Sequence, residues 1–123
     1  MFTVNEDGSI YATRGDIAFF TLMAEENGVG YIFQPGDVLR MKIFQKKNPS
    51  RVLLSKSFLI SEASDRALLF LSGDETKFGP TISKPTDYWY EIEHNPATNP
   101  QTIIGYDADG PKVFRLFPEG ADG

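Results

Sequence analysis

Two acidic side chains, Glu91 and Glu93, are the residues whose type and spacing best suit a chemical reaction. Residues two apart in a β-strand lie on the same face, so these carboxylates are spaced like the acid pair that glycoside hydrolysis uses. The same spacing is typical of the solvated face of an amphipathic strand. His94, the only histidine, is expected in a solvated loop beside Asn95. We interpret all three as surface residues and expect a protein that is not an enzyme.

Other reaction chemistries lack their residues. The chain has no cysteine, which excludes thiolate catalysis, disulfides and cysteine-based zinc sites. The sequence contains neither a Gly-x-Ser-x-Gly elbow nor a glycine-rich phosphate loop. Asp107-Ala108-Asp109-Gly110 resembles half of a calcium loop, but the twelfth position of that loop would be Pro118, which cannot ligate. We therefore expect a hairpin turn there, with no metal and no cofactor.

Arg14-Gly15-Asp16 has the sequence of the integrin-binding tripeptide. As a binding motif, it would present a cation and a carboxylate at the tip of a loop. As a structural element, it breaks the pattern between two strands, where glycine suits a turn. So short a motif is a weak indicator, and we favour the turn.

Trp89 is the candidate for an interaction surface. It lies on the outward face of its expected strand with Glu91 and Glu93, and Phe44 lies on the outward face of another strand. Exposed aromatic side chains bind protein surfaces or stack on sugars, although a second layer of the fold could also cover them. Protein interfaces are enriched in Trp, Tyr and Phe, so we place protein contact ahead of sugar.

The segment that positions these residues is a strand from Thr86 to Glu93. Tyr88, Tyr90 and Ile92 alternate with the outward residues, and Pro85 marks the beginning of the strand. This segment can bury more apolar area than any other, so the remaining strands are expected to pack around it. Tyr90 also resembles the tyrosine that anchors the corner of immunoglobulin-like domains by its hydroxyl.

Short alternating segments separated by turn residues predict the rest of the fold. The strand 38–45 alternates clearly, whereas 17–24 is apolar on nearly both sides and is expected to be covered on both faces. Gln34-Pro35-Gly36-Asp37 predicts a type II turn, and the segment 72–80 is the only plausible helical turn. The segments 101–106 and 112–117 are expected to form a closing hairpin. The pattern indicates an all-β fold, a single immunoglobulin-like antiparallel β-sandwich of about eight strands.

Length and charge restrict the class further. The 123 residues suit one domain, 1–123, with a core from about 10 to 117 and a flexible tail at 118–123. A formal net charge of −5 disfavours nucleic acid or an anionic membrane as a partner. The acidic N-terminus does not resemble a signal peptide, and no apolar run approaches membrane-spanning length. The absence of cysteine suits a reducing cytoplasm.

Several segments together resemble a known family, the small tail- or baseplate-associated β-sandwich proteins of bacteriophages and prophages of Gram-positive bacteria. Within that family the chain resembles the N-terminal domain of the baseplate upper protein. The resemblance extends from about Ile10 to Phe117 and consists of strand and turn patterns. The segments are Arg14-Gly15-Asp16 with the apolar strand that follows, Gln34 to Phe44, Leu71 to Thr76, and Asp87 to Ile92.

The resemblance implies a non-enzymatic structural protein that binds other protein subunits, either further copies of itself or phage tail components. It would occupy the bacterial cytoplasm before assembly and the virion afterwards. The chain departs from the family after Phe117, because no heptad pattern for a trimerising helix follows, which suggests a stand-alone accessory protein. The alternative function is a carbohydrate-binding module that recognises a cell-surface glycan through exposed aromatic residues.

Overall fold

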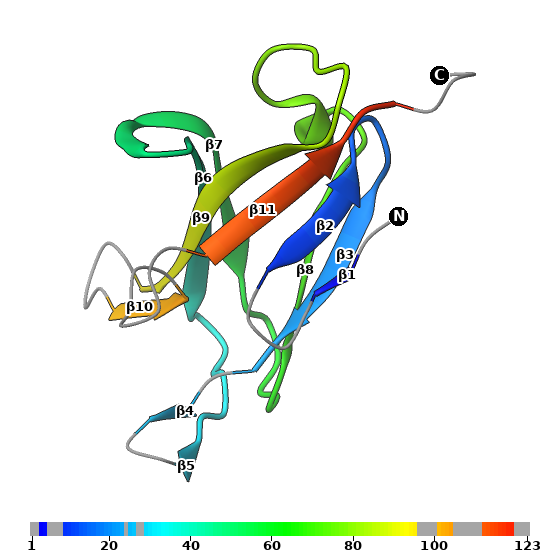
Figure 1. Ribbon diagram of the computed structural model, residues 1–123. Helices are drawn as coiled ribbons and strands as arrows, with labels where there is room; N and C mark the ends of the chain where they lie inside the picture. Colours follow the sequence, from blue (N-terminus) through cyan, green and yellow to red (C-terminus); the bar gives the residue numbers. More distant parts are fainter. Residues whose placement is uncertain are drawn as a thin grey trace.

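The computed structural model describes residues 3–4, 9–23, 25–26, 29–95, 101–104 and 112–119. Within these residues the fold is all-β, with a single short 3-10 helix (Figure 1). Eleven strands are described: β1 (Thr3–Val4), β2 (Ile10–Thr13), β3 (Ala18–Leu22), β4 (Glu25–Glu26), β5 (Val29–Gly30), β6 (Val38–Gln45), β7 (Asn48–Leu59), β8 (Ala67–Leu71), β9 (Thr86–His94), β10 (Gln101–Ile104) and β11 (Lys112–Phe117). The 3-10 helix, η1 (Glu75–Lys77), lies between β8 and β9.

The strands form a large sheet, a small sheet and a ribbon. The large sheet has the order β1-β2-β11-β9-β6-β7, and β10 also pairs with β9. The small sheet consists of β3 and β8 alone, and β4 and β5 form a two-stranded ribbon at the lower end of the molecule in Figure 1. The hydrophobic core contains residues of both the large and the small sheet.

β9 is the central strand of the large sheet, as the sequence predicts. It pairs with β6 along one edge and with β11 and then β10 along the other. Its inward side chains Tyr88, Tyr90 and Ile92 are at most 4% exposed. They belong to the same buried core cluster as Leu69, Leu71 and the inward residues of β6. Burial alternates along both strands, so the predicted period of two is confirmed for β6 and β9.

Two details of the expected topology are wrong. The sheet is not purely antiparallel, because β11 runs parallel to β2, with Phe114 opposite Ile10 and Leu116 opposite Ala12. The expected closing hairpin also does not form, since β10 and β11 each pair with β9 instead. β9 is long enough for β11 and β10 to pair with it one after the other, along the edge that β6 does not occupy. The short distance in sequence between β10 and β11 had favoured their pairing with each other.

The expectation that β3 is covered on both faces is wrong. Ala18, Phe20 and Leu22 are buried, but Phe19 alternates with them and is exposed on the other side. In β8 the buried residues also alternate with exposed ones. Residues 17–23 are therefore covered on one face only by the described residues, and the apolar side chains on their other face are exposed. Ala24 lies outside the described residues.

The turn at residues 34–37 is confirmed. Gly36 has a φ of +94°, which L side chains rarely adopt, and the Asp37 N–H donates to the Gln34 carbonyl at 3.0 Å. The turn is fixed to the end of β7 because the Gly36 N–H donates to the Ile60 carbonyl at 2.9 Å. This turn sets where β6 begins.

Thr76 connects the turn between β2 and β3 to η1. It is fully buried, and its Oγ1 accepts the Gly15 N–H at 3.0 Å and donates to the Asp16 carbonyl at 2.8 Å. The backbones approach so closely that a Cβ on Gly73 would lie 2.6 Å from the Gly15 carbonyl oxygen. Only glycine fits at position 73 without displacing the turn.

We expect Thr76→Val to destabilise the protein by about 1–3 kcal/mol, because the isosteric change leaves buried backbone groups without hydrogen bonds. Urea unfolding followed by fluorescence measures the change. Thr81→Val, at an exposed position, is the matched control and should alter the free energy of unfolding little. Equal unfolding midpoints for the two variants would contradict the role given to Thr76.

Candidate functional site

The four residues predicted for an interaction surface lie together on the outer face of the large sheet. Phe44 is directly opposite Trp89 in the β6–β9 register, and Glu91 and Glu93 follow on the same face of β9. All four are partly buried. The structure therefore brings the predicted residues together, while their role in binding stays a prediction.

Basic residues of β6 face the two carboxylates. Arg40 Nη2 lies 3.1 Å from Glu93 Oε1, and Lys42 Nζ lies 3.9 Å from the same oxygen. Burial raises the pKa of Glu91, and the neighbouring charge of Glu93 raises it further, against the attraction of Lys42 and Arg40. Neither carboxylate lines the cavity described below. The arrangement is a row of opposite charges across two strands, and the face that carries it is partly buried rather than fully solvated.

His94 does not lie in a solvated loop, and this expectation is wrong. It is the last residue of β9, its side chain is 12% exposed, and its Nε2 lies 3.1 Å from Asp37 Oδ2. The Tyr31 hydroxyl donates to the same carboxylate oxygen at 2.8 Å, and the Tyr31 and His94 rings meet edge to face. The tight turn at 34–37 brings Asp37 to the end of β9, a long-range pairing that local sequence does not indicate.

This cluster connects three segments of the chain. Asn95 accepts a hydrogen bond from the Val38 N–H through its Oδ1 at 2.9 Å, and its own N–H donates to the Val38 carbonyl at 2.7 Å. Its φ of 48° places it in the left-handed region, which Asn tolerates better than most residues. The polar groups of the cluster bond to one another, so we interpret it as a structural latch between β6 and β9.

The Arg14-Gly15-Asp16 triplet forms a turn. Arg14 is 9% exposed and its Nη1 donates to the Phe78 carbonyl at 3.3 Å, while Gly15 has a φ of +89°. A receptor-binding triplet would present its guanidinium to solvent, whereas this one lies within the protein. The turn interpretation is the one that the contacts support.

No group of three or more His, Cys, Asp or Glu side chains within the described residues is arranged to hold a metal ion. The possible calcium segment, 107–110, lies outside these residues. No helix in the part of the chain that the structure describes has the length and apolar character needed to cross a membrane.

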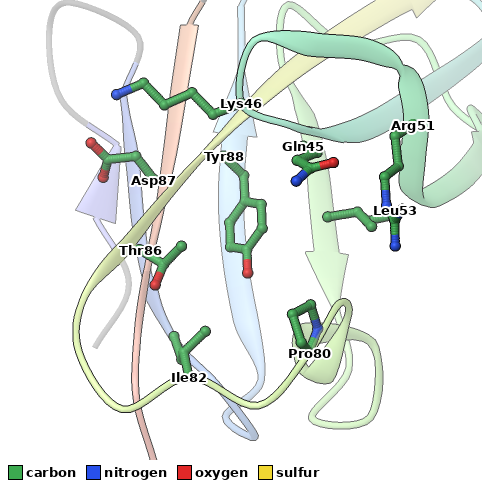
Figure 2. Close-up of a pocket in the computed structure, with 9 residues that line it drawn as sticks. All are labelled: Gln45, Lys46, Arg51, Leu53, Pro80, Ile82, Thr86, Asp87 and Tyr88. Carbon is green, nitrogen blue, oxygen red and sulfur yellow. The ribbon is translucent and has the colours of Figure 1, made fainter.

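A cavity of about 340 Å³ lies between the β6–β7 hairpin and the segment that leads into β9 (Figure 2). The hairpin contributes one wall, the segment from Pro80 to Thr86 the other, and Tyr88 lies between them. The lining residues are Gln45, Lys46, Arg51, Leu53, Pro80, Ile82, Thr86, Asp87 and Tyr88. Sequence reasoning missed this site, because its residues come from three segments that no local pattern connects. The only hint of this site in the sequence was Tyr88, an inward residue that carries a hydroxyl group.

Comparison of the chain with protein-family models, with curated proteins and with solved structures finds no match.

The pKa of Asp37 predicts a change in stability at low pH. Burial alone would raise this pKa, but hydrogen bonds from the Gln34 N–H, His94, Tyr31 and Asn95 outweigh it and lower the pKa from 3.8 to about 2. A carboxylate with a lowered pKa in the folded state stabilises the protein above its unfolded pKa, and this contribution is lost as the pH falls through the folded value.

We therefore expect wild-type stability to fall by about 1–2 kcal/mol between pH 4 and pH 2 from this group, after allowance for screening by solvent. Asp37→Asn should flatten this part of the curve of melting temperature against pH. Asp65→Asn, at an exposed position beside Arg66, is the control and should leave the curve unchanged. An Asp37→Asn curve with the wild-type slope would refute the latch.

Proposed function

We propose that this protein is a non-enzymatic structural subunit that assembles with further copies of itself through the outer face of its small sheet. The observation that carries the proposal is an apolar face that the described residues leave uncovered. Five large apolar residues form this face, each between 42 and 66% exposed: Ile17, Phe19, Met23, Leu68 and Phe70. We call this set the small-sheet patch.

The patch is contiguous across the two strands. Phe19 lies opposite Phe70 in the β3–β8 register with ring centroids 6.2 Å apart, and Leu68 lies opposite Thr21. The largest contiguous apolar patch of a protein is often functional, and such patches mark sites of association. Scattered single leucines would carry no such meaning.

The edges of the small sheet add backbone hydrogen-bonding groups. Within the described residues β3 and β8 pair only with each other, so each strand has one unpaired edge. An unpaired edge is a template for a strand of another molecule. A second copy of the small sheet can extend the first by antiparallel pairing while the apolar side chains come together.

A second copy is the partner that the charge and area favour. All five side chains of the patch are uncharged, so two patches can meet without like-charge repulsion, although each chain carries a formal charge of −5. The patch exposes roughly 500 Å² in total if each side chain leaves about half of its area in water. A stable interface needs about 800 Å² from each partner, so the patch and one strand edge supply most of it. A two-fold arrangement uses the same surface on both copies.

At its edge the patch also contacts a charged pair that is already neutralised. Lys56 Nζ lies 3.8 Å from the centre of the Phe70 ring and 2.6 Å from Glu75 Oε1. The lysine faces inward from β7 opposite Met41, which explains why it interrupts the apolar pattern of that strand. Lys56 therefore brings no unpaired charge to the edge of the small-sheet patch.

The proposal extends to the setting in which such a subunit works. The strand and turn patterns that resemble phage and prophage tail or baseplate proteins support a virion-associated subunit, made in the bacterial cytoplasm. The two packed sheets, joined near the 3-10 turn, support an immunoglobulin-like sandwich whose small sheet another copy completes. Tail components that meet the face around Trp89 and Phe44 are further partners under this proposal.

The chain offers a matched pair of leucines for the test. Leu68 in the patch is 66% exposed, and Leu59, on β7, is 71% exposed. Leu59 neighbours Phe58, which packs against the core, so it faces outward from the large sheet. Both can be changed to serine with little effect on folding.

We expect the wild-type mass in sedimentation equilibrium to rise with concentration in the micromolar range. Leu68→Ser should weaken association by roughly tenfold or more, since each of two copies loses a buried apolar side chain. Leu59→Ser should associate like the wild type. A wild-type protein that stays monomeric, or a Leu59→Ser variant that is impaired equally, would overturn the proposal.

A further inference from the structure

We propose that the cavity between the β6–β7 hairpin and the segment before β9 is a binding site for a small apolar carboxylic acid. The site is separate from the small-sheet patch, so it does not depend on the proposed assembly. Three features carry the inference: an apolar wall, a tyrosine hydroxyl that opens onto the cavity, and an exposed guanidinium at its rim that has no ion-pair partner among the described residues.

The wall is apolar and comes from both sides of the cavity. Leu53 projects from the hairpin, and Pro80 and Ile82 face it from the opposite segment (Figure 2). A volume of about 340 Å³ is at the lower end of the range for small-molecule sites, which is roughly 300–1,000 Å³. The space suits a branched aliphatic group of a few carbons.

The Tyr88 hydroxyl is the deep polar group of the cavity. Tyr88 is 4% exposed and lines the cavity, and Figure 2 shows its hydroxyl directed between Ile82 and Pro80. Among the described residues this hydroxyl forms no hydrogen bond, and its oxygen is not sealed from solvent, so it opens onto the cavity. A ligand oxygen that accepts its proton takes the place of water there.

The hydroxyl is a donor at neutral pH. Burial raises the pKa of Tyr88 above its ordinary value of 10, although the nearby charge of Arg14 opposes this shift. The phenol therefore keeps its proton and requires an acceptor in the ligand. Carboxylate oxygens are acceptors only, so they match this requirement.

The charge at the rim favours an anion. Arg51 lines the hairpin side of the cavity, and no acidic group among the described residues forms an ion pair with it. Asp87, the one acid of the lining, is already held by Arg115, with Nε–Oδ1 and Nη2–Oδ2 distances of 2.7 and 3.2 Å. Lys46 lies beside Asp87 in Figure 2. Arg51 is therefore the cation that would pair with an anionic ligand.

The ligand that fits carries one carboxylate beside an aliphatic body. Its carboxylate would meet the Arg51 guanidinium and the Tyr88 hydroxyl, and its body would pack against Leu53, Pro80 and Ile82. A free carboxylic acid and the terminal residue of a peptide share this chemistry. 4-Methylpentanoate represents the first source, and N-acetyl-L-leucine the second.

The test titrates both acids and their uncharged amides into the full chain and follows methyl and amide signals by NMR. We expect saturable shifts for at least one acid, centred on Leu53 and Ile82. The matching amide should bind at least about tenfold more weakly, because it loses the charge-assisted hydrogen bonds. The acid that binds more tightly identifies the source.

Two variants test whether the Tyr88 hydroxyl and the Arg51 guanidinium bind the carboxylate. Tyr88→Phe keeps the ring and should weaken binding about two- to tenfold. Arg51→Gln should reduce binding of the acid to the level of the amide. Arg66→Gln is the matched control, because Arg66 is 59% exposed beside Asp65 and does not line the cavity. It should bind like the wild type.

Three results would overturn the inference. The first is the absence of saturable shifts for either acid up to tens of millimolar. The second is equal affinity for an acid and its amide, which would remove the role of the charge. The third is wild-type affinity in Tyr88→Phe and Arg51→Gln, both of which keep the fold if their spectra match elsewhere.

Discussion

The packing of aromatic rings beneath β9 is the interaction on which the rest of the structure depends. Phe78, which follows η1, meets the Tyr88 ring at 5.0 Å and the Phe114 ring at 5.5 Å, both edge to face. Tyr90 contacts Phe114 from the neighbouring position. One set of rings thus holds the central strand, the parallel strand β11 and the turn between β8 and β9 in place. Edge-to-face contacts of this kind add stability beyond the burial of apolar area.

The two layers of the fold are unequal, and the surface features follow from this inequality. A large sheet of seven strands faces a small sheet of two, which covers the core from one side with Phe20, Leu22, Leu69 and Leu71. The outer side of the small sheet has no further layer in the described residues and is nevertheless apolar. On the large sheet the outer face instead carries paired charges beside Trp89 and Phe44. The outer faces of the two sheets therefore differ in chemical character.

Local patterns in the sequence predicted the parts of the fold that local physics determines. The inward face of β9, the alternation of β6, the turn with Gly36 and the helical turn near Thr76 were all readable in this way. The parallel pairing of β11 with β2 was not, because it joins segments about a hundred residues apart. The latch at His94 and the cavity around Tyr88 were missed for the same reason. The two-sided apolar pattern of 17–24 was recognised, but its outer half belongs to the exposed patch.

The central proposal is that a second copy covers the outer face of the small sheet, which the described residues leave open. Hydrogen–deuterium exchange at low and high protein concentration tests this most directly, since it reports protection of individual backbone amides. The account predicts that amides of β3 and β8 become more protected as concentration rises, while those of β9 stay equally protected at both. Exchange of β3 and β8 that does not change with concentration would contradict it.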